Sequence, residues 1–195
     1  MKVVVFANSR AVAAKGAEPE IILGADSAIL RPGEPVFLAN DSSVGASRIV
    51  PAVRIGRLGT HIPFGAADAY IDAHTLIHLL VPQGDEAVPP TLWGISDRTF
   101  SPGKWLDGTL PDRPYEVKLE VAPLEKPDNS RLQTLLCTLT RQTAGACVAA
   151  ISKYCTLKTG DILLLADCPL EAEVMPDTLV AASLTNQKVL DLKIK

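Results

Sequence analysis

The feature that most restricts the fold is a succession of short apolar runs, each ended by glycine, proline, aspartate or serine. Such runs, rich in branched residues, are typical of strands. In Tyr115–Val121 apolar and charged residues alternate, which is the period of a strand with one buried face. The predicted strands are Val3–Phe6, Glu20–Leu23, Pro35–Leu38, Arg48–Leu58, His74–Val81, Tyr115–Val121, Asp161–Leu165, Thr178–Leu184 and Lys188–Ile194.

Only two segments favour helices. Phe64–Asp72 is rich in alanine and follows a proline, and Ala144–Ser152 carries branched apolar residues at helical spacing. Asn186 and Gln187, between the last two predicted strands, predict a tight hairpin. We therefore expect a mostly β fold with a few short helices (α+β), in a single domain that covers residues 1–195.

Composition excludes several classes of protein. Apolar residues make up 47% of the chain and charged residues 21%, which favours a globular fold over disorder. The net charge is -3 and basic residues do not cluster, so we expect neither a nucleic-acid partner nor a membrane surface. The apolar run at Val3–Phe6 is too short for a signal peptide, and the expected location is the cytoplasm. Buried, reduced thiols are expected at Cys137, Cys147, Cys155 and Cys168.

Several motifs, in this order, resemble the fumarylacetoacetate hydrolase family. Pro35–Leu38 is followed by Arg57–Ile62, and then by Ala67, Tyr70 and Asp72 without a gap. The most marked match is Thr156–Asp161, a Thr-Leu-Lys-x-Gly-Asp motif before an apolar strand. Met175–Lys195 resembles the closing hairpin of the family, so the similarity extends over nearly the whole chain.

The resemblance implies a β-roll of packed mixed sheets around a central pocket, paired as a homodimer. Members of the family hydrolyse, decarboxylate, hydrate or isomerise small 2-oxo and 2,4-dioxo acids. They use Mg²⁺ or Mn²⁺ to polarise the carbonyl group and to stabilise the enolate charge that develops.

The positions that should bind this cation carry the wrong residues. The family has two glutamates one residue apart on a strand, which here correspond to Arg48 and Val50. Its aspartate, seven residues beyond Asp72, corresponds to Leu79. A hard cation needs oxygen ligands, which none of the three provides. Pro51 is also expected to interrupt the hydrogen bonding of this strand.

Histidines do not replace the missing carboxylates. His74 and His78 are four residues apart, a spacing that binds zinc on a helix, but the segment is predicted to be a strand. On a strand both would point to the face opposite Leu79. His61 is expected to structure its loop rather than to act in catalysis.

The other catalytic positions of the family are altered as well. Its N-terminal arginine, tyrosine and Glu-His pair correspond roughly to Asn8, Arg10, Val12 and Ala13. Leu92–Ser96 resembles the stretch before its lysine, but the next residue here is Asp97, followed by Arg98. Its Thr-Gly-Thr-Pro turn corresponds to Leu165–Pro169. The positions of the former pocket are thus Arg10, Arg48, Val50, Leu79, Asp97 and Arg98.

These substitutions favour a pseudoenzyme with a degenerate active site, without a metal and without catalytic residues. Such a protein would bind a protein partner, for example a paralogous subunit. Alternatively, it would bind a small carboxylate ligand through Arg48, Arg10 and Arg98. The alternative is an active enzyme of small 2-oxo acids that uses Mg²⁺ or Mn²⁺ and relocated residues. The candidates for that role are Asp85, Glu86, Asp97, Asp167, Glu171 and Glu173.

Overall fold

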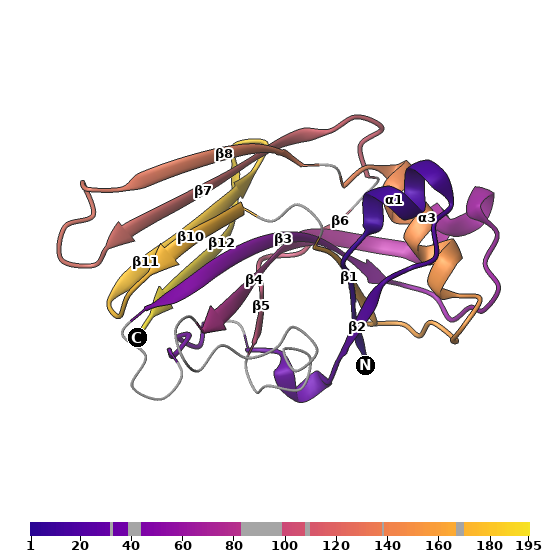
Figure 1. Ribbon diagram of the computed structural model, residues 1–195, viewed down its shortest axis with the longest axis horizontal. Coiled ribbons are helices and arrows are strands. Elements are labelled where there is room, and N and C mark those ends of the chain that lie inside the picture. Colours follow the sequence, from indigo (N-terminus) through magenta and orange to yellow (C-terminus); the bar gives the residue numbers. More distant parts are fainter. Residues whose placement is uncertain (32, 39–43, 83–98, 108–109, 138, 167–169) are drawn as a thin grey trace.

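The chain forms two β-sheets that face each other, with a group of short helices at one end (Figure 1). The structure, a computed structural model, describes residues 1–195 except 32, 39–43, 83–98, 108–109, 138 and 167–169. Sheet A contains β1 (Val3–Phe6), β2 (Ile21–Gly24), β3 (Gly45–Ile55), β4 (Ile71–Pro82), β5 (Phe100–Pro102), β6 (Leu106–Asp107), β9 (Ile162–Leu165) and β10 (Leu170–Val174). Sheet B contains β7 (Tyr115–Pro123), β8 (Arg131–Cys137), β11 (Thr178–Leu184) and β12 (Gln187–Ile194).

Sheet A is mixed and sheet B is antiparallel. In sheet A the strand order is β2-β1-β9-β3-β4-β5, with β10 on β3 and β6 on β4. Only β1 and β9 run parallel, and both are buried along their whole length, as expected for a parallel pair covered on two faces. Sheet B has the order β12-β11-β7-β8, so β8 is an edge strand. The expected fold, mostly β with packed mixed sheets, is confirmed.

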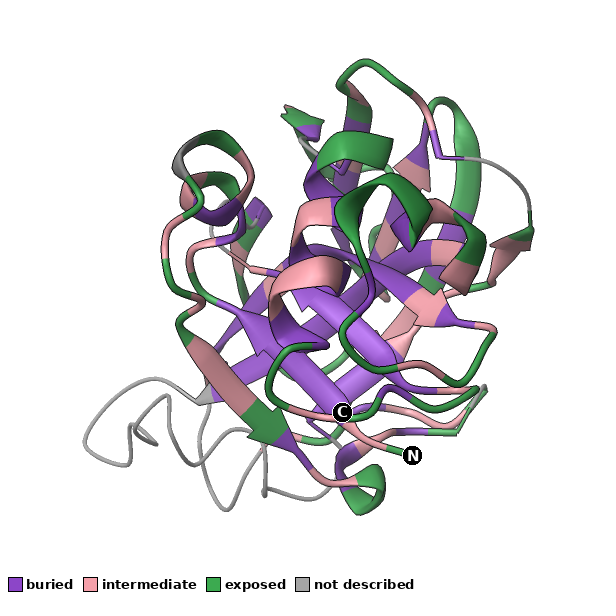
Figure 2. Cartoon of the chain, turned by 90° about the vertical axis from the view of Figure 1, so that its right-hand side faces the viewer, coloured by how far each residue is buried: buried purple, intermediate pink, exposed green. Residues whose placement is uncertain are grey.

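Apolar side chains fill the space on both faces of sheet A. The main cluster lies between the sheets and joins Val53 and Leu76 of sheet A to Leu119 and Val180 of sheet B. A second, smaller cluster covers the opposite face of sheet A. The buried strands of the sheet lie behind the helices in Figure 2.

Helix α3 (Arg141–Ile151) packs against α1 (Ser9–Lys15) and against the 3-10 helix η2 (Phe64–Tyr70). The side chain of Thr140 accepts a hydrogen bond from the backbone of Thr143 (3.2 Å) and so caps the start of α3. A further 3-10 turn, η1 (Asp26–Ala28), follows β2. Within the described part of the chain, no helix is long and apolar enough to cross a membrane.

Several local predictions differ from the structure. Phe64–Asp72 forms a 3-10 helix only as far as Tyr70, because Ile71 already begins β4. In Pro35–Leu38 only Val36 pairs, through an isolated bridge to Ile194. The hairpin between β11 and β12 turns at Thr185 and Asn186, both with positive φ, one residue earlier than predicted.

Pro51 does not interrupt β3, which runs unbroken through it, so this expectation is wrong. Pro51 lies opposite Leu76, whose carbonyl oxygen turns away from β3 and accepts from the backbone of Gly103 (2.9 Å). On the other side of β3, pairing with β10 ends at Ile49 and pairing with β9 begins at Ala52. The missing N–H group of Pro51 therefore falls where no neighbouring strand needs it.

Candidate functional site

The three positions expected to carry metal ligands lie side by side at the centre of sheet A. Arg48 of β3 pairs with Leu79 of β4, and Val50 pairs with Ile77 on the same face. Side chains at Val50 and Leu79 are 1% and 2% exposed. The alignment of the positions therefore holds in space, but two of them are closed to solvent.

This face of sheet A is filled with hydrocarbon. Val50 and Leu79 belong to the second apolar cluster, where Phe100, the register partner of Leu79, is completely buried. The buried members of this cluster are Val3, Val5, Ala28, Val50, Ala52, Ile77, Leu79, Phe100, Ile162 and Leu164. Side chains that interdigitate in this way leave no room for a hydrated cation.

Arg48 is held by a carboxylate of the chain itself. Its Nε donates to Oε2 of Glu171 (2.6 Å), and Glu171 is its register partner on the adjacent strand β10. Both side chains are partly exposed, which agrees with an ion pair at the margin of the apolar cluster. Glu171, one of the relocated carboxylates considered above, is therefore committed to a guanidinium group.

The residues present do not fit Mg²⁺ or Mn²⁺. A guanidinium group and two alkyl groups supply no oxygen ligand, and burial in hydrocarbon removes the water that would complete an octahedral shell. Across the described ranges, no three His, Cys, Asp or Glu side chains come together in a group suited to a metal.

The two neighbouring histidines face the main core, on the side away from Leu79, as the strand register predicts. His78 pairs with Ile49, and neither of its ring nitrogens has a hydrogen-bond partner. Burial lowers the pKa of His78 to about 3 and also lowers the pKa of His74. Both rings are therefore neutral at pH 7. His61 adopts a left-handed backbone (φ 50°), and its amide donates to Ser152, which is a structural role in the loop.

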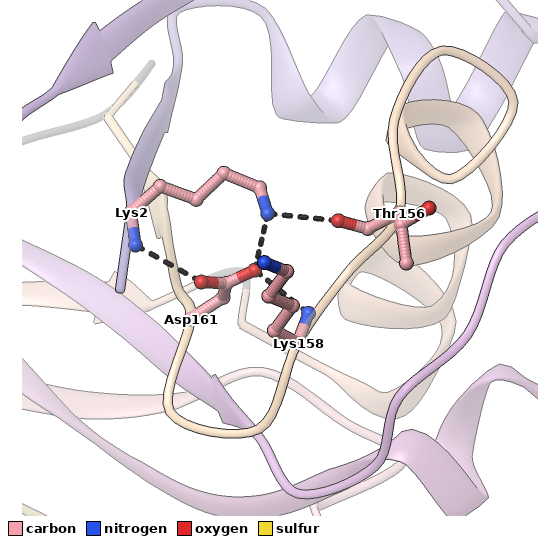
Figure 3. A network of polar contacts seen from close by, with 4 residues as sticks. All are labelled: Lys2, Thr156, Lys158 and Asp161. Carbon is pink, nitrogen blue, oxygen red and sulfur yellow. Dashed lines mark hydrogen bonds and ion pairs between the residues drawn. The ribbon is translucent and has the colours of Figure 1, made fainter.

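The motifs that suggested the family act as structural anchors. Asp161 accepts hydrogen bonds from the backbone amides of Lys2 (2.9 Å) and Lys158 (2.8 Å), and from the Lys2 ammonium group (Figure 3). Burial alone would raise the pKa of Asp161, but these bonds hold it below its ordinary value. Gly59 pairs with Leu157, and a Cβ atom at Gly59 would meet Tyr70 at 2.4 Å.

A second anchor joins two more of the matching positions. Both carboxylate oxygens of Asp72 accept from Arg54, at 2.9 and 3.1 Å, so the contact is bidentate. The Gly56 amide donates to Tyr70 (2.8 Å) beside it. These contacts fix the turn between β3 and the 3-10 helix η2.

The remaining predicted positions are dispersed. Arg10 is exposed on α1, whose start is tied to the following loop because the Asn8 amide group donates to the Glu18 carbonyl oxygen (2.9 Å). Val12, on the same helix, is buried. Asp97 and Arg98 lie outside the described residues, as do Asp85, Glu86, Asp167 and Cys168.

Cys137 and Cys147 are buried, Cys155 is half-buried, and no disulfide joins these three described cysteines.

One hollow was not predicted from the sequence. It has a volume of about 400 Å³ and lies between the edges of the two sheets, with Arg31, Lys104 and Trp105 among its lining residues. The relevant signal in the sequence is weak, because Arg31 and Lys104 are isolated basic residues more than seventy positions apart. Only the fold brings them to the same hollow.

Comparisons of sequence find no known family whose profile matches the chain, and no curated protein that matches it. Comparisons of structure, in contrast, find many similar folds. The 5-carboxymethyl-2-hydroxymuconate delta-isomerase from Mycobacterium smegmatis superposes with a TM-score of 0.78 at 21% identity, covering 99% of this chain and 78% of the other.

Two further structures show the same fold. The 2-hydroxyhepta-2,4-diene-1,7-dioate isomerase from Mycobacterium marinum has a TM-score of 0.76 at 22% identity, over 99% of this chain and 73% of that one. A fumarylacetoacetate hydrolase family protein from Yersinia pestis has a TM-score of 0.74 at 15% identity, over 100% and 92%. The predicted resemblance is thus confirmed for the fold, which is that of fumarylacetoacetate hydrolase family proteins.

Proposed function

We propose that this chain is a divergent member of the fumarylacetoacetate hydrolase family that has lost metal-dependent catalysis and acts by binding a partner. The observation that carries this proposal is the state of the expected metal site. Val50 and Leu79 are packed in an apolar cluster with Phe100, and Arg48 is paired with Glu171. A scaffold of this kind keeps the family's turns and core without its chemistry.

The reactions for which the structural neighbours are named indicate what the loss of the metal ligands would remove. The two isomerases named above are named for unsaturated hydroxy acids that carry more than one carboxylate. A cation that stabilises an enolate must be held by oxygen ligands next to the reacting carbonyl group. Replacing those ligands by Val50 and Leu79 removes both the cation and the space it would occupy.

Calorimetry with Mg²⁺ and Mn²⁺ tests this proposal. We expect no stoichiometric heat of binding for this chain with either metal. An assay with 2-hydroxyhepta-2,4-diene-1,7-dioate, with and without metal, should show no turnover above the buffer. One metal ion bound per chain, or metal-dependent turnover, would overturn the proposal and support the relocated active site instead.

The proposed partner is a second copy of the chain. Edge strand β8 exposes Leu132 (63%) and Leu136 (66%) on the outer face of sheet B. An antiparallel pair of β8 strands centred on Thr134 would place Leu132 of one copy opposite Leu136 of the other. An exposed apolar edge strand favours such pairing. A paralogous subunit with the same edge is the alternative occupant, and the three thiols agree with the proposed cytoplasmic location.

The carboxylate ligand predicted at Arg48 stays a prediction, and binding it would require the Arg48–Glu171 ion pair to break. Such a ligand would have to displace Glu171, whose carboxylate already accepts a hydrogen bond from the Arg48 guanidinium at 2.6 Å. A dicarboxylate that leaves the thermal midpoint unchanged would argue against it. We therefore place the function of this region in structure rather than in recognition of a ligand.

A further inference from the structure

The hollow lined by Arg31 and Lys104 lies where the chain crosses from one sheet to the other. Leu30 donates its amide to Phe100 of β5 (2.8 Å), at the edge of sheet A. Six residues later, Val36 donates to Lys193 of β12 (3.0 Å), at the edge of sheet B. The crossing segment leaves beneath it a hollow of about 400 Å³, which is in the size range of small-molecule sites.

The electrostatic balance of this hollow is positive. Arg31 and Lys104 are exposed, and neither forms an ion pair or a side-chain hydrogen bond with another residue that the structure describes. The Asp191 carboxylate, which also lines the hollow, is 2.6 Å from the Lys188 ammonium group and is thus already neutralised. Two cationic groups therefore remain available to an anion.

The hollow also contains a buried hydroxyl group without a partner. Ser101 is 1% exposed, and its Oγ makes no hydrogen bond to any residue that the structure describes. A buried hydroxyl group left in this state costs free energy that a bound acceptor or donor recovers. Trp105, Leu30 and Leu190 supply apolar surface to the same hollow.

We propose that this hollow is a binding site for a small organic anion with an apolar body. Its anionic group lies between Arg31 and Lys104, its body packs against Trp105, and a polar atom reaches the Ser101 hydroxyl. A carboxylate and a phosphate ester share this chemistry. None of the former metal positions Arg48, Val50 and Leu79 lines this hollow, so the site does not depend on the proposed loss of catalysis, although Trp105 also packs against the apolar cluster that contains Val50 and Leu79.

Trp105 is the reporter for the test. The chain has two tryptophans, Trp93 and Trp105, so the Trp93→Phe variant assigns the indole N–H signal of Trp105 in a proton–nitrogen correlation spectrum. Benzoate, phenyl phosphate and inorganic phosphate are then titrated separately. We expect a saturable shift of the Trp105 signal with benzoate or phenyl phosphate, and none with inorganic phosphate, which lacks the apolar body.

Variants separate this site from general surface attraction. Arg31→Gln together with Lys104→Gln should weaken binding about tenfold or more, since both charge-assisted hydrogen bonds are lost. Ser101→Ala should weaken it by a smaller factor. Arg57→Gln, an exposed arginine outside the hollow, is the matched control and should leave the affinity unchanged. Comparing the affinity for benzoate with that for phenyl phosphate shows whether a carboxylate or a phosphate ester is preferred.

Two outcomes would overturn the site. One is the absence of a saturable Trp105 shift with either aromatic anion. The other is an equal loss of affinity in the Arg57→Gln control and in the double variant, which would reveal attraction by net charge alone. Because Arg31, Lys104 and Arg57 are exposed, an unchanged melting temperature should accompany their variants.

Discussion

His78 on β4 and Ser101 on β5 are register partners, and neither the imidazole ring nor the hydroxyl group has a hydrogen-bond partner. His78 is completely buried, so the ring is kept neutral by desolvation rather than by a neighbouring charge. An unpaired polar ring in the core reduces stability, and it does so more strongly in acid.

Replacing His78 by leucine, which has a similar volume, should raise the free energy of unfolding at pH 7 by about 1–2 kcal/mol. The pKa of His78 is about 3 in the folded chain and near 6.5 when unfolded. Between these values the unfolded chain binds the extra proton, so stability falls as the pH falls, by about 1.4 kcal/mol per pH unit. Urea unfolding from pH 7 to pH 4 measures both effects.

The control for this prediction is His61→Asn, which keeps a residue that tolerates the left-handed backbone of an exposed loop. It should leave the dependence on pH unchanged. His78→Leu should flatten the slope, with a remainder from His74, whose pKa is also lowered by burial. A slope identical to that of the wild type would show that His78 is not desolvated.

Leu79→Ala should destabilise the fold by about 2–5 kcal/mol, because it opens a cavity in a filled apolar cluster. If Leu79 lined an open pocket, the loss would be close to that of an exposed leucine. Leu58→Ala, at a leucine that is 68% exposed, supplies that reference value. Chemical unfolding at pH 7 compares the two, and equal losses would contradict the filled site.

Asp161→Asn should destabilise the fold by about 2–3 kcal/mol, since three donors converge on its carboxylate and an amide group cannot accept from all of them. The pKa of Asp161 is lowered on folding, so its contribution is complete above the unfolded value near 3.9 and is lost as the pH falls below it. Thermal melts at pH 7 and pH 3 should therefore differ more for the wild type than for the variant. Asp128→Asn, at an exposed position, should match the wild type.

Leu136→Glu should convert the proposed dimer to a monomer, because it places a charge opposite Leu132 of the other copy in the edge-to-edge contact of β8. Light scattering coupled to size-exclusion chromatography measures the mass. Leu58→Glu, at an equally exposed leucine in the segment between β3 and η2, should remain a dimer. A wild-type chain that is monomeric at all concentrations would rule out the second copy as the partner.

The regular parts of the fold could be predicted because the two faces of each strand differ. Tyr115–Val121 alternates so clearly that β7 is found almost to its ends. Edge strand β8 was missed because its first four residues are exposed on both faces and only Leu135 and Cys137 turn inward, so that its sequence has no period of two. Helix α1 was missed because seven residues are too few to show a helical period, and its left-handed end at Gly16 is a signal only once the helix is known.

The candidate site divides in the same way. Arg48, Val50 and Leu79 could be assigned from local spacing because they lie on adjacent strands of one sheet. The pairing of Arg48 with Glu171 could not, since it depends on a strand 123 residues later. Arg31 and Lys104 were not considered, because nothing in the sequence indicates that the two loop segments that carry them meet.

The parallel pairing of β1 with β9 has a consequence for the order of folding. Val3 pairs with Ile162, and Lys2 with Asp161, so β1 can pair with β2 early, but its other edge stays open until β9 has been synthesised. Closing so long a loop is slow, so β1, which is wholly apolar, must wait with one edge unpaired while the chain grows. We expect this chain to fold late and as a whole, and to depend on protection of its first residues while it grows.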